Sequence, residues 1–177
     1  KLFSDNRFQN IKLNEDAQTI FDSRTYSIET KNFENIQDIE NKNLIIFDNN
    51  LSFETSDFKD NKFNKIFLVL NKNENRKIKL NQKNIEFKEN LFEDQKKRLL
   101  EKSIDCKIID INDLETMKEN LLCLYPSVGE NLDFINSKKL KNISFLYRKI
   151  DQYSWKYCNK GFFNFKNYIP KIVQEFI

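Results

Sequence analysis

Histidine is absent from this 177-residue chain, and glycine and proline occur only twice each. Without an imidazole, a Ser-His-Asp triad, a histidine general base and a histidine-ligated metal are all excluded. The two glycines, Gly129 and Gly161, are too few and too far apart for a GxxxxGK[ST] or a GxGxxG loop. The sequence therefore predicts that no glycine-rich loop binds a nucleotide.

Cysteine is also scarce, and its three positions, Cys106, Cys123 and Cys158, form no CxxC pair. This spacing argues against a zinc cluster and suits a reducing compartment. No apolar run approaches the ~18 residues that a membrane span needs. Residues 1–14 lack the apolar core of a signal peptide. We therefore expect a cytoplasmic protein with no membrane contact, no metal and no cofactor.

The charges nearly cancel, since 30 Lys and Arg stand against 27 Asp and Glu, a net charge of +3. Such a balance provides no general attraction to nucleic acid or to an anionic membrane. Hydrophobic residues make up 39% of the chain and include 17 Phe, which is enough for a core. The length fits one domain, or one domain with a small lid.

Two short apolar runs give the strongest local signal. Residues 44–47 are continuously apolar and end at Asp48, and residues 66–70 form a second run. Runs of this kind, flanked by polar residues, are typical of strands buried on both faces of a parallel sheet. Residues 85–87 and 107–111 are expected to form shorter extended segments.

Helical periodicity dominates the second half of the chain. Apolar residues at helical spacing predict helices over 91–104, 113–124 and 142–158, and an earlier one over 32–39. A last helix is expected to begin at Asn164 as its N-cap. We therefore expect an α/β core over residues 1–90, followed by a helical lid over residues 91–177.

The C-terminal segments resemble the lid of a known family. Residues 145–154 would be a long lid helix, Gly161 a turn, Asn164 the capping residue and 169–177 the final short helix. This order is similar to that of the DnaA/Hda-type AAA+ proteins, in which a capping Thr stands at the position of Asn164. Working backwards, the resemblance matches residues 44–48, 66–71 and 84–88 to the Walker B strand, the sensor-1 strand and the last core strand.

The resemblance implies a parallel-sheet, AAA+-like (P-loop NTPase-like) α/β core with a small C-terminal helical lid, but without ATPase chemistry. Asp48 falls at the Mg²⁺-binding Walker B position, and Asn49 follows it where a Glu would polarise water. Lys141 falls at the sensor-2 arginine, residues 79–83 lack the finger arginine, and residues 11–24 lack the P-loop. The resemblance therefore implies a non-catalytic, degenerate relative.

Such a relative would regulate chromosomal replication initiation through contacts with DnaA or the sliding clamp, although residues 9–13 lack the Pro of a clamp-binding peptide. The alternatives are a clamp-loader δ-like subunit, a nucleic-acid-binding α/β domain with weak DNA contact, and an enzyme built on Asp48. The candidate partner-binding residues are Lys138, Lys139, Lys141, Arg148 and Trp155. For these residues a solvated face and simple core packing remain the alternatives.

Overall fold

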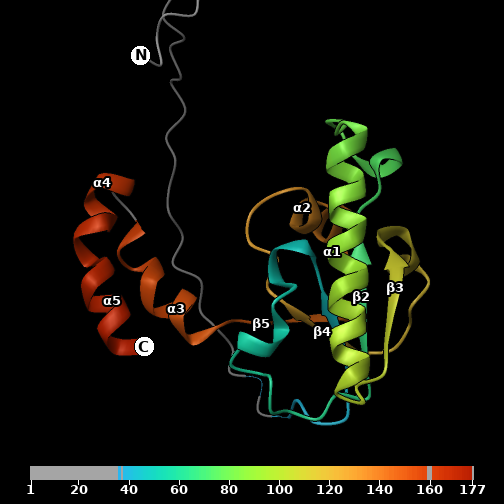
Figure 1. Ribbon diagram of the computed structural model, residues 1–177, viewed down its shortest axis with the longest axis horizontal. Coiled ribbons are helices and arrows are strands. Elements are labelled where there is room, and N and C mark those ends of the chain that lie inside the picture. The colour runs from blue at the N-terminus through green and yellow to red at the C-terminus, as the bar shows by residue number, and fades with distance from the viewer. Residues whose placement is uncertain (1–35, 37, 159–160, 177) are drawn as a thin grey trace, which may run out of the picture. The chain divides into compact units, whose positions relative to one another are not determined.

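Five parallel strands form a single sheet in the part of the chain that the structure describes (Figure 1), in the order β3-β2-β1-β4-β5. The structure is a computed structural model and describes residues 36, 38–158 and 161–176. The expected α/β class and the parallel sheet are confirmed. The strands are β1 (Asn43–Ile46), β2 (Lys65–Leu70), β3 (Cys106–Asp110), β4 (Leu121–Leu124) and β5 (Ile143–Leu146).

Two helices connect neighbouring strands. Helix α1 (Gln82–Glu101) joins β2 to β3, and α2 (Glu130–Ser137) joins β4 to β5. From β1 to β3 the chain builds the sheet in one direction, and from β4 to β5 it builds it in the other. Because crossovers between parallel strands are right-handed, this reversal places α1 and α2 on opposite faces of the sheet. Helices α3 (Lys149–Trp155), α4 (Phe162–Phe165) and α5 (Ile169–Phe176) follow β5.

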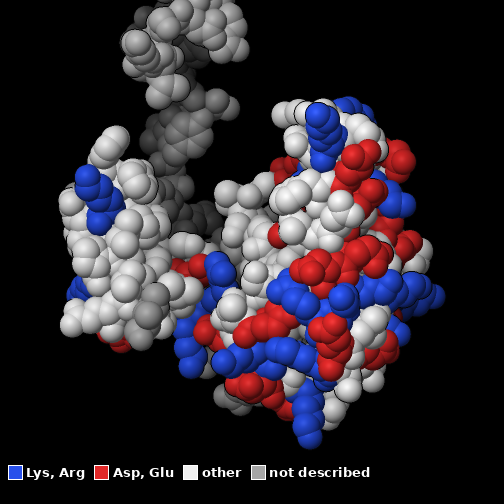
Figure 2. All heavy atoms as spheres, viewed as in Figure 1, with Lys and Arg blue, Asp and Glu red and all other residues white. Residues whose placement is uncertain are grey.

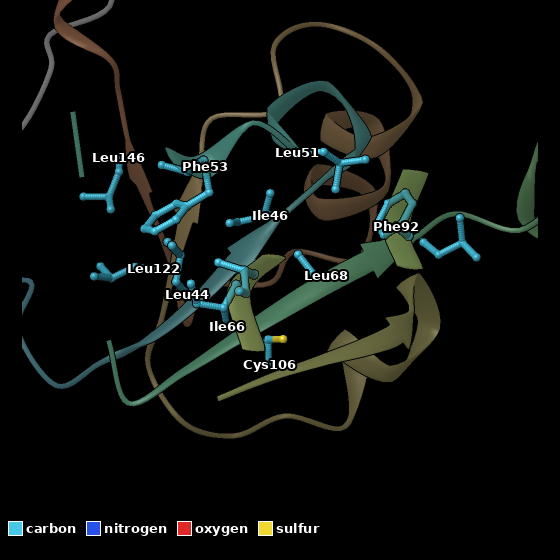
Figure 3. Packing of buried hydrophobic residues seen from close by; sticks show 13 residues of the cluster. Leu44, Ile46, Leu51, Phe53, Ile66, Leu68, Phe92, Cys106, Leu122 and Leu146 are labelled. Carbon is cyan, nitrogen blue, oxygen red and sulfur yellow. The ribbon is translucent and has the colours of Figure 1, made fainter. Parts of the chain in front are cut away.

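Each face of the sheet carries its own apolar cluster. On one face (Figure 3), Leu44 and Ile46 of β1 pack in a cluster with Phe92 and Leu99 of α1. The cluster on the other face includes Ile45 of β1 together with side chains of β2, β4 and α2. Strand β1 is therefore covered on both sides, as its continuous apolar run predicts. Burying each such side chain contributes about 1.5–3 kcal/mol.

Helix α1 begins earlier than its apolar stripe suggested. The side chain of Asn81 accepts a hydrogen bond from the backbone N–H of Asn84, which satisfies a free donor of the first turn. Phe92, Gln95 and Leu99 are buried along the helix, while Phe87 is exposed. The expected strand over residues 84–88 is therefore wrong, because these residues form the first turns of α1.

The expected helix over 113–124 is also wrong, and the one over 142–158 is present only in its second half, as α3. Within residues 113–124 the chain makes a short 3₁₀ turn and then β4, whose four residues are buried on both faces. Within residues 142–158 it forms β5 before α3 begins. In both places a short apolar run is compatible with a helix as well as with a buried strand. The strand forms because β4 pairs with β1 and β5 pairs with β4.

The C-terminal helices differ in detail from the expectation. The final helix is present as α5, but Asn164 lies inside α4, and the N-cap of α4 is Gly161. Gly161 has a φ of 77°, a conformation that glycine adopts without steric cost. The expected boundary at residue 90 falls within α1, and β3, β4 and β5 all follow it.

Several expectations concern residues outside the described part of the chain. The segment 9–13, compared with a clamp-binding peptide, and the segment 11–24, which lacks a P-loop, both lie outside the described residues. Of the expected helix over 32–39, only residues 36, 38 and 39 are described, and they are not helical. Among the described residues, no helix has both the length and the apolar character to cross a membrane.

Candidate functional site

Among the described strands, the sheet has one topological switch point, between β1 and β4. The chain leaves β1 toward β2 and leaves β4 toward β5, in opposite directions along the sheet. The loops after β1 and β4 therefore diverge at the carboxyl edge of the sheet. In open α/β sheets the crevice opened in this way is where ligands bind. Here it lies between the loop that begins at Asp48, after β1, and the loop at residues 125–129, after β4.

Asp48 is held by two side chains from different elements. Its Oδ2 atom accepts a hydrogen bond from the ammonium group of Lys88 on α1. Its Oδ1 atom accepts one from Asn131 Nδ2 on α2, at 3.1 Å. Asn131 Oδ1 in turn accepts from Nδ2 of the buried Asn71, at the end of β2, at 3.3 Å. One polar chain therefore ties β1, β2, α1 and α2 together behind the crevice.

This arrangement bears on the expected Walker B role of Asp48. Both carboxylate oxygens are engaged, and the negative charge is matched by Lys88. A divalent cation would have to displace these partners before the carboxylate could ligate it. Among the described residues, moreover, no group of three or more Cys, Asp or Glu side chains is placed to hold a metal ion. The geometry makes Asp48 a structural anchor of the crevice.

A second ion pair supports the other wall. Arg76, in the loop after β2, has a side chain only 10% exposed, and its Nη1 atom lies 2.5 Å from Glu130 Oε2 at the start of α2. Its Nε atom also donates to the backbone oxygen of Asn71, at 3.1 Å. The guanidinium therefore fixes the amino end of α2 against the end of β2.

Two hollows flank the loop that begins at Asp48, and both are lined by Asp48 and Asn49. The first, of about 330 Å³, contains two guanidinium groups, and we call it the arginine hollow. Its lining is Asp48, Asn49, Asn50, Leu51, Ser52, Thr55, Ser56, Leu91, Arg98, Leu124 and Arg148.

The second hollow, of about 220 Å³, lies at the loop that precedes α2, and we call it the glycine-loop hollow. Its lining is Asp48, Asn49, Arg76, Pro126, Val128, Gly129, Glu130 and Asn131. Gly129 has a φ of 138°, which favours glycine over any residue with a side chain. Asn50 Nδ2 donates to the backbone oxygen of Tyr125, at 3.1 Å, and so ties the loops after β1 and β4 together.

The predicted site residues fall at opposite edges of the sheet. Lys138, Lys139 and Lys141 precede β5 and so lie at the amino edge, where Lys138 pairs with Glu115 at 2.7 Å. Asp48 and Arg148 follow β1 and β5 and lie at the carboxyl edge. The sheet therefore brings Asp48 and Arg148 to one hollow and separates Lys141 from both.

Trp155, the fifth predicted residue, packs against aromatic rings that follow β4 and β5. Its indole lies 5.6 Å from the ring of Tyr125 and 5.8 Å from that of Tyr147, both in edge-to-face geometry. Burial raises the pKa of the Tyr147 phenol above its ordinary value, and the nearby phenol of Tyr125 adds to this effect. Trp155 therefore joins α3 to the carboxyl edge of the sheet.

Lys88, Arg76, Arg98 and Asn131 were not singled out from the sequence. For Lys88 a signal existed, because Asn81 is a good N-cap and a helix beginning at Gln82 places Lys88 on the same face as Phe92, Gln95 and Leu99. For the other three residues, no pattern in the neighbouring sequence predicts that the folded chain brings them to the crevice.

No protein-family model matches this chain, and no curated protein or solved structure is significantly similar to it.

Proposed function

We propose that this chain is a non-catalytic binding domain and that its binding site is the crevice at the switch point. The observation that carries the proposal is the position of the two hollows. Both share Asp48 and Asn49, at the one place where the strand order reverses. The order β3-β2-β1-β4-β5 is that of five strands of the doubly wound sheets that bind ligands at this place.

The chemistry of the crevice favours binding over catalysis. The carboxylate of Asp48 is matched by Lys88, and Arg76 is matched by Glu130. No histidine exists in the chain to act as a base near neutral pH. Fixed ion pairs and amide groups can orient a ligand through hydrogen bonds, but they offer no activated nucleophile.

The test is a titration of the isotope-labelled chain with neutral and anionic small molecules, followed by backbone amide shifts. Adenosine, nicotinamide and glucose serve as neutral probes, and AMP and citrate as anionic ones. We expect at least one probe to cause saturable shifts at residues 48–52 or 126–131. If no probe shifts these amides in a saturable way, the proposal is wrong.

Two variants make this test specific. Asn49→Trp places a large side chain at one of the two residues that line both hollows, and we expect it to abolish the shifts. Lys141→Trp is the matched control, because Lys141 is exposed at the opposite edge of the sheet. Binding that survives Asn49→Trp would place the site elsewhere.

A second candidate is regulation of replication initiation through contacts with DnaA or the sliding clamp. Two observations support it. Strands β1 and β2, which the resemblance matched to the Walker B and sensor-1 strands, are parallel neighbours. Phe162 and Phe163 of α4 are exposed by 65% and 81%, and exposed aromatic side chains are common in protein interfaces. The segments 84–88 and 145–154 do not add to this support, because 84–88 lie in α1 and 145–154 begin with the end of β5, where the resemblance required a strand and one long helix.

Purified DnaA and purified clamp, each immobilised, provide the test of this candidate. Binding that is lost on substitution of Phe162 and Phe163 by Ser would support it. Absence of binding to both proteins would exclude these two partners and leave the crevice proposal unaffected.

A further inference from the structure

The arginine hollow differs from its neighbour in the charges that face it. In the glycine-loop hollow, Arg76 and its partner Glu130 both belong to the lining, so the pair is neutral within the site. In the arginine hollow, Arg98 and Arg148 belong to the lining, whereas the carboxylates that pair with them do not. The one carboxylate in its lining is Asp48, whose two oxygens already accept hydrogen bonds.

Arg148 is held in a fixed orientation. Its Nε and Nη2 atoms donate to the two oxygens of Asp151, at 2.7 and 2.9 Å. The hydrogen bond to Asp151 raises the pKa of the guanidinium, so the group stays charged. Within the described residues its third nitrogen, Nη1, makes no hydrogen bond. A planar fork with one edge fixed and the other open suits an oxyanion.

Arg98, on α1, is held by side chains of the same helix and of the loop after β1. Its Nη2 atom donates to Oε1 of the buried Gln95, at 2.6 Å. Its Nε atom lies 3.1 Å from Asp94 Oδ2, and its Nη1 atom 3.6 Å from Glu54 Oε2. The Nε contact is close enough for an ion pair but is not aligned as a hydrogen bond. Two oriented cations thus reach the hollow with little rotamer freedom left to lose on binding.

Beside these cations the hollow offers neutral donors and an apolar wall. Asn49, Ser52 and Thr55 supply amide and hydroxyl groups, and Leu51, Leu91 and Leu124 supply apolar surface. This mixture suits an organic molecule with one charged end.

If the crevice is a binding site, as proposed above, these contacts specify the chemical class of its ligand. We propose that the arginine hollow binds a small organic ligand through one anionic group, a carboxylate or a phosphate monoester, placed between Arg98 and Arg148.

The surrounding charges limit the ligand to a single anionic group. Five carboxylates (Asp48, Glu54, Asp57, Asp94 and Asp151) surround three cations (Lys88, Arg98 and Arg148). Figure 2 likewise shows acidic and basic side chains interspersed over the face that carries α1, without a patch of one sign. A polyphosphate needs a surplus of positive charge or a nest of backbone amides, and this site has neither.

The experiment uses the full chain and two bare anions as probes. Orthophosphate and acetate are titrated separately at constant ionic strength, and the Nε–H signals of Arg98 and Arg148 are followed with the amides of residues 49–56. We expect saturable shifts with at least one anion. In Arg148→Gln the affinity for that anion should fall by at least about tenfold. Binding of phosphate alone identifies a phosphate monoester, and binding of acetate alone identifies a carboxylate.

Three further variants control this result. Arg98→Gln should weaken binding as Arg148→Gln does, and Arg148→Lys should retain part of it, because the charge remains without the fork. Lys118→Gln, at an exposed position before β4 and so at the opposite edge of the sheet, should leave the affinity unchanged. Equal affinities in wild type and in both Gln variants would overturn the proposal.

The two proposals fail in different ways. Shifts at the crevice with adenosine but with neither anion would overturn the anionic ligand and leave the crevice as a binding site. Shifts with no probe at all would overturn both proposals.

Discussion

Lys88 on α1 donates a hydrogen bond to Asp48 at the end of β1, although 40 residues separate them in the chain. Both side chains are about three-quarters buried, so the pair is shielded from solvent more than a surface ion pair is. It fixes the long crossover helix to the strand at the centre of the sheet, beside the proposed binding crevice.

Removing one member of this pair should destabilise the fold. We expect Lys88→Met or Asp48→Asn to lower the free energy of unfolding by about 1–3 kcal/mol, because the remaining partner loses its charged hydrogen bond. The double variant should recover part of this loss, and urea unfolding of all four proteins measures the coupling. Lys96→Met, which breaks the exposed pair with Glu93 on the same helix, should cost less than about 0.5 kcal/mol. Strictly additive losses would show that the two groups do not interact.

The two phenylalanines of α1 should respond very differently to truncation. Phe92 is 1% exposed and packs against the face of the sheet that α1 covers, so Phe92→Ala should lower the free energy of unfolding by about 3–5 kcal/mol. Phe87 is 64% exposed, so Phe87→Ala should stay within about 0.5 kcal/mol of wild type. Chemical denaturation compares them directly. A large loss at Phe87 would contradict its place on the outer face of α1.

Stability should fall at alkaline pH because of Cys123. Burial raises the pKa of this thiol above its ordinary value of 9.0, whereas the unfolded chain leaves it near that value. The folded state thus keeps a proton that the unfolded state loses, and this contribution is fully present below pH 9.0 and is lost as the pH rises. We expect wild type to lose about 1.4 kcal/mol more than Cys123→Ala for each pH unit above this value.

Unfolding in urea with a reductant, on both sides of pH 9.0, measures this difference. Cys158→Ala is the matched control, because Cys158 is exposed and its replacement should leave the pH dependence as it is. Parallel pH profiles for wild type and Cys123→Ala would contradict the burial of the thiol.

Trp155 and Tyr125 should be energetically coupled. Their rings meet edge to face at 5.6 Å, and such pairs contribute about 0.5–1.5 kcal/mol beyond the area they bury. A double-mutant cycle with Trp155→Leu and Tyr125→Leu, followed by circular dichroism during urea unfolding, measures this coupling. Phe163→Leu, at an exposed position of α4, should show none with Tyr125→Leu. A coupling near zero for the first pair would mean that α3 does not dock on the end of β4.

The sequence was sufficient for part of the sheet. Strands β1 and β2 were predicted because long apolar runs between polar residues suit strands buried on both faces. Strand β4 was missed because its four apolar residues also continue the helical spacing set by Leu114 and Met117. Periodicity cannot separate a short buried strand from a helical turn. That choice depends on pairing with β1, which is a property of the folded chain.

Of the residues that line or support the crevice, Asp48 and Arg148 were named from the sequence. Asp48 stood out because it ends an apolar run, and strand ends of this kind meet at one edge of a parallel sheet. Its partners Lys88 and Asn131 come from helices on opposite faces, and neither contact follows from local sequence. Lys141 and Arg148, both named from the sequence as candidate partner-binding residues, lie at opposite edges of the sheet, because Lys141 precedes β5 and Arg148 follows it.

The position of β1 at the centre of the sheet has a consequence for synthesis of the chain. Its first neighbour, β2, follows soon after it in the chain, but β4 emerges only after α1 and β3 have been made. The hydrogen bond between the side chains of Asn43 and Glu119, at 3.4 Å, joins residues that are 76 positions apart. Until then one edge of an apolar strand without proline stays unpaired, and such edges recruit other chains. A ribosome-bound chain is therefore most exposed to aggregation between the emergence of β1 and that of β4, which is the interval in which a chaperone would protect it most.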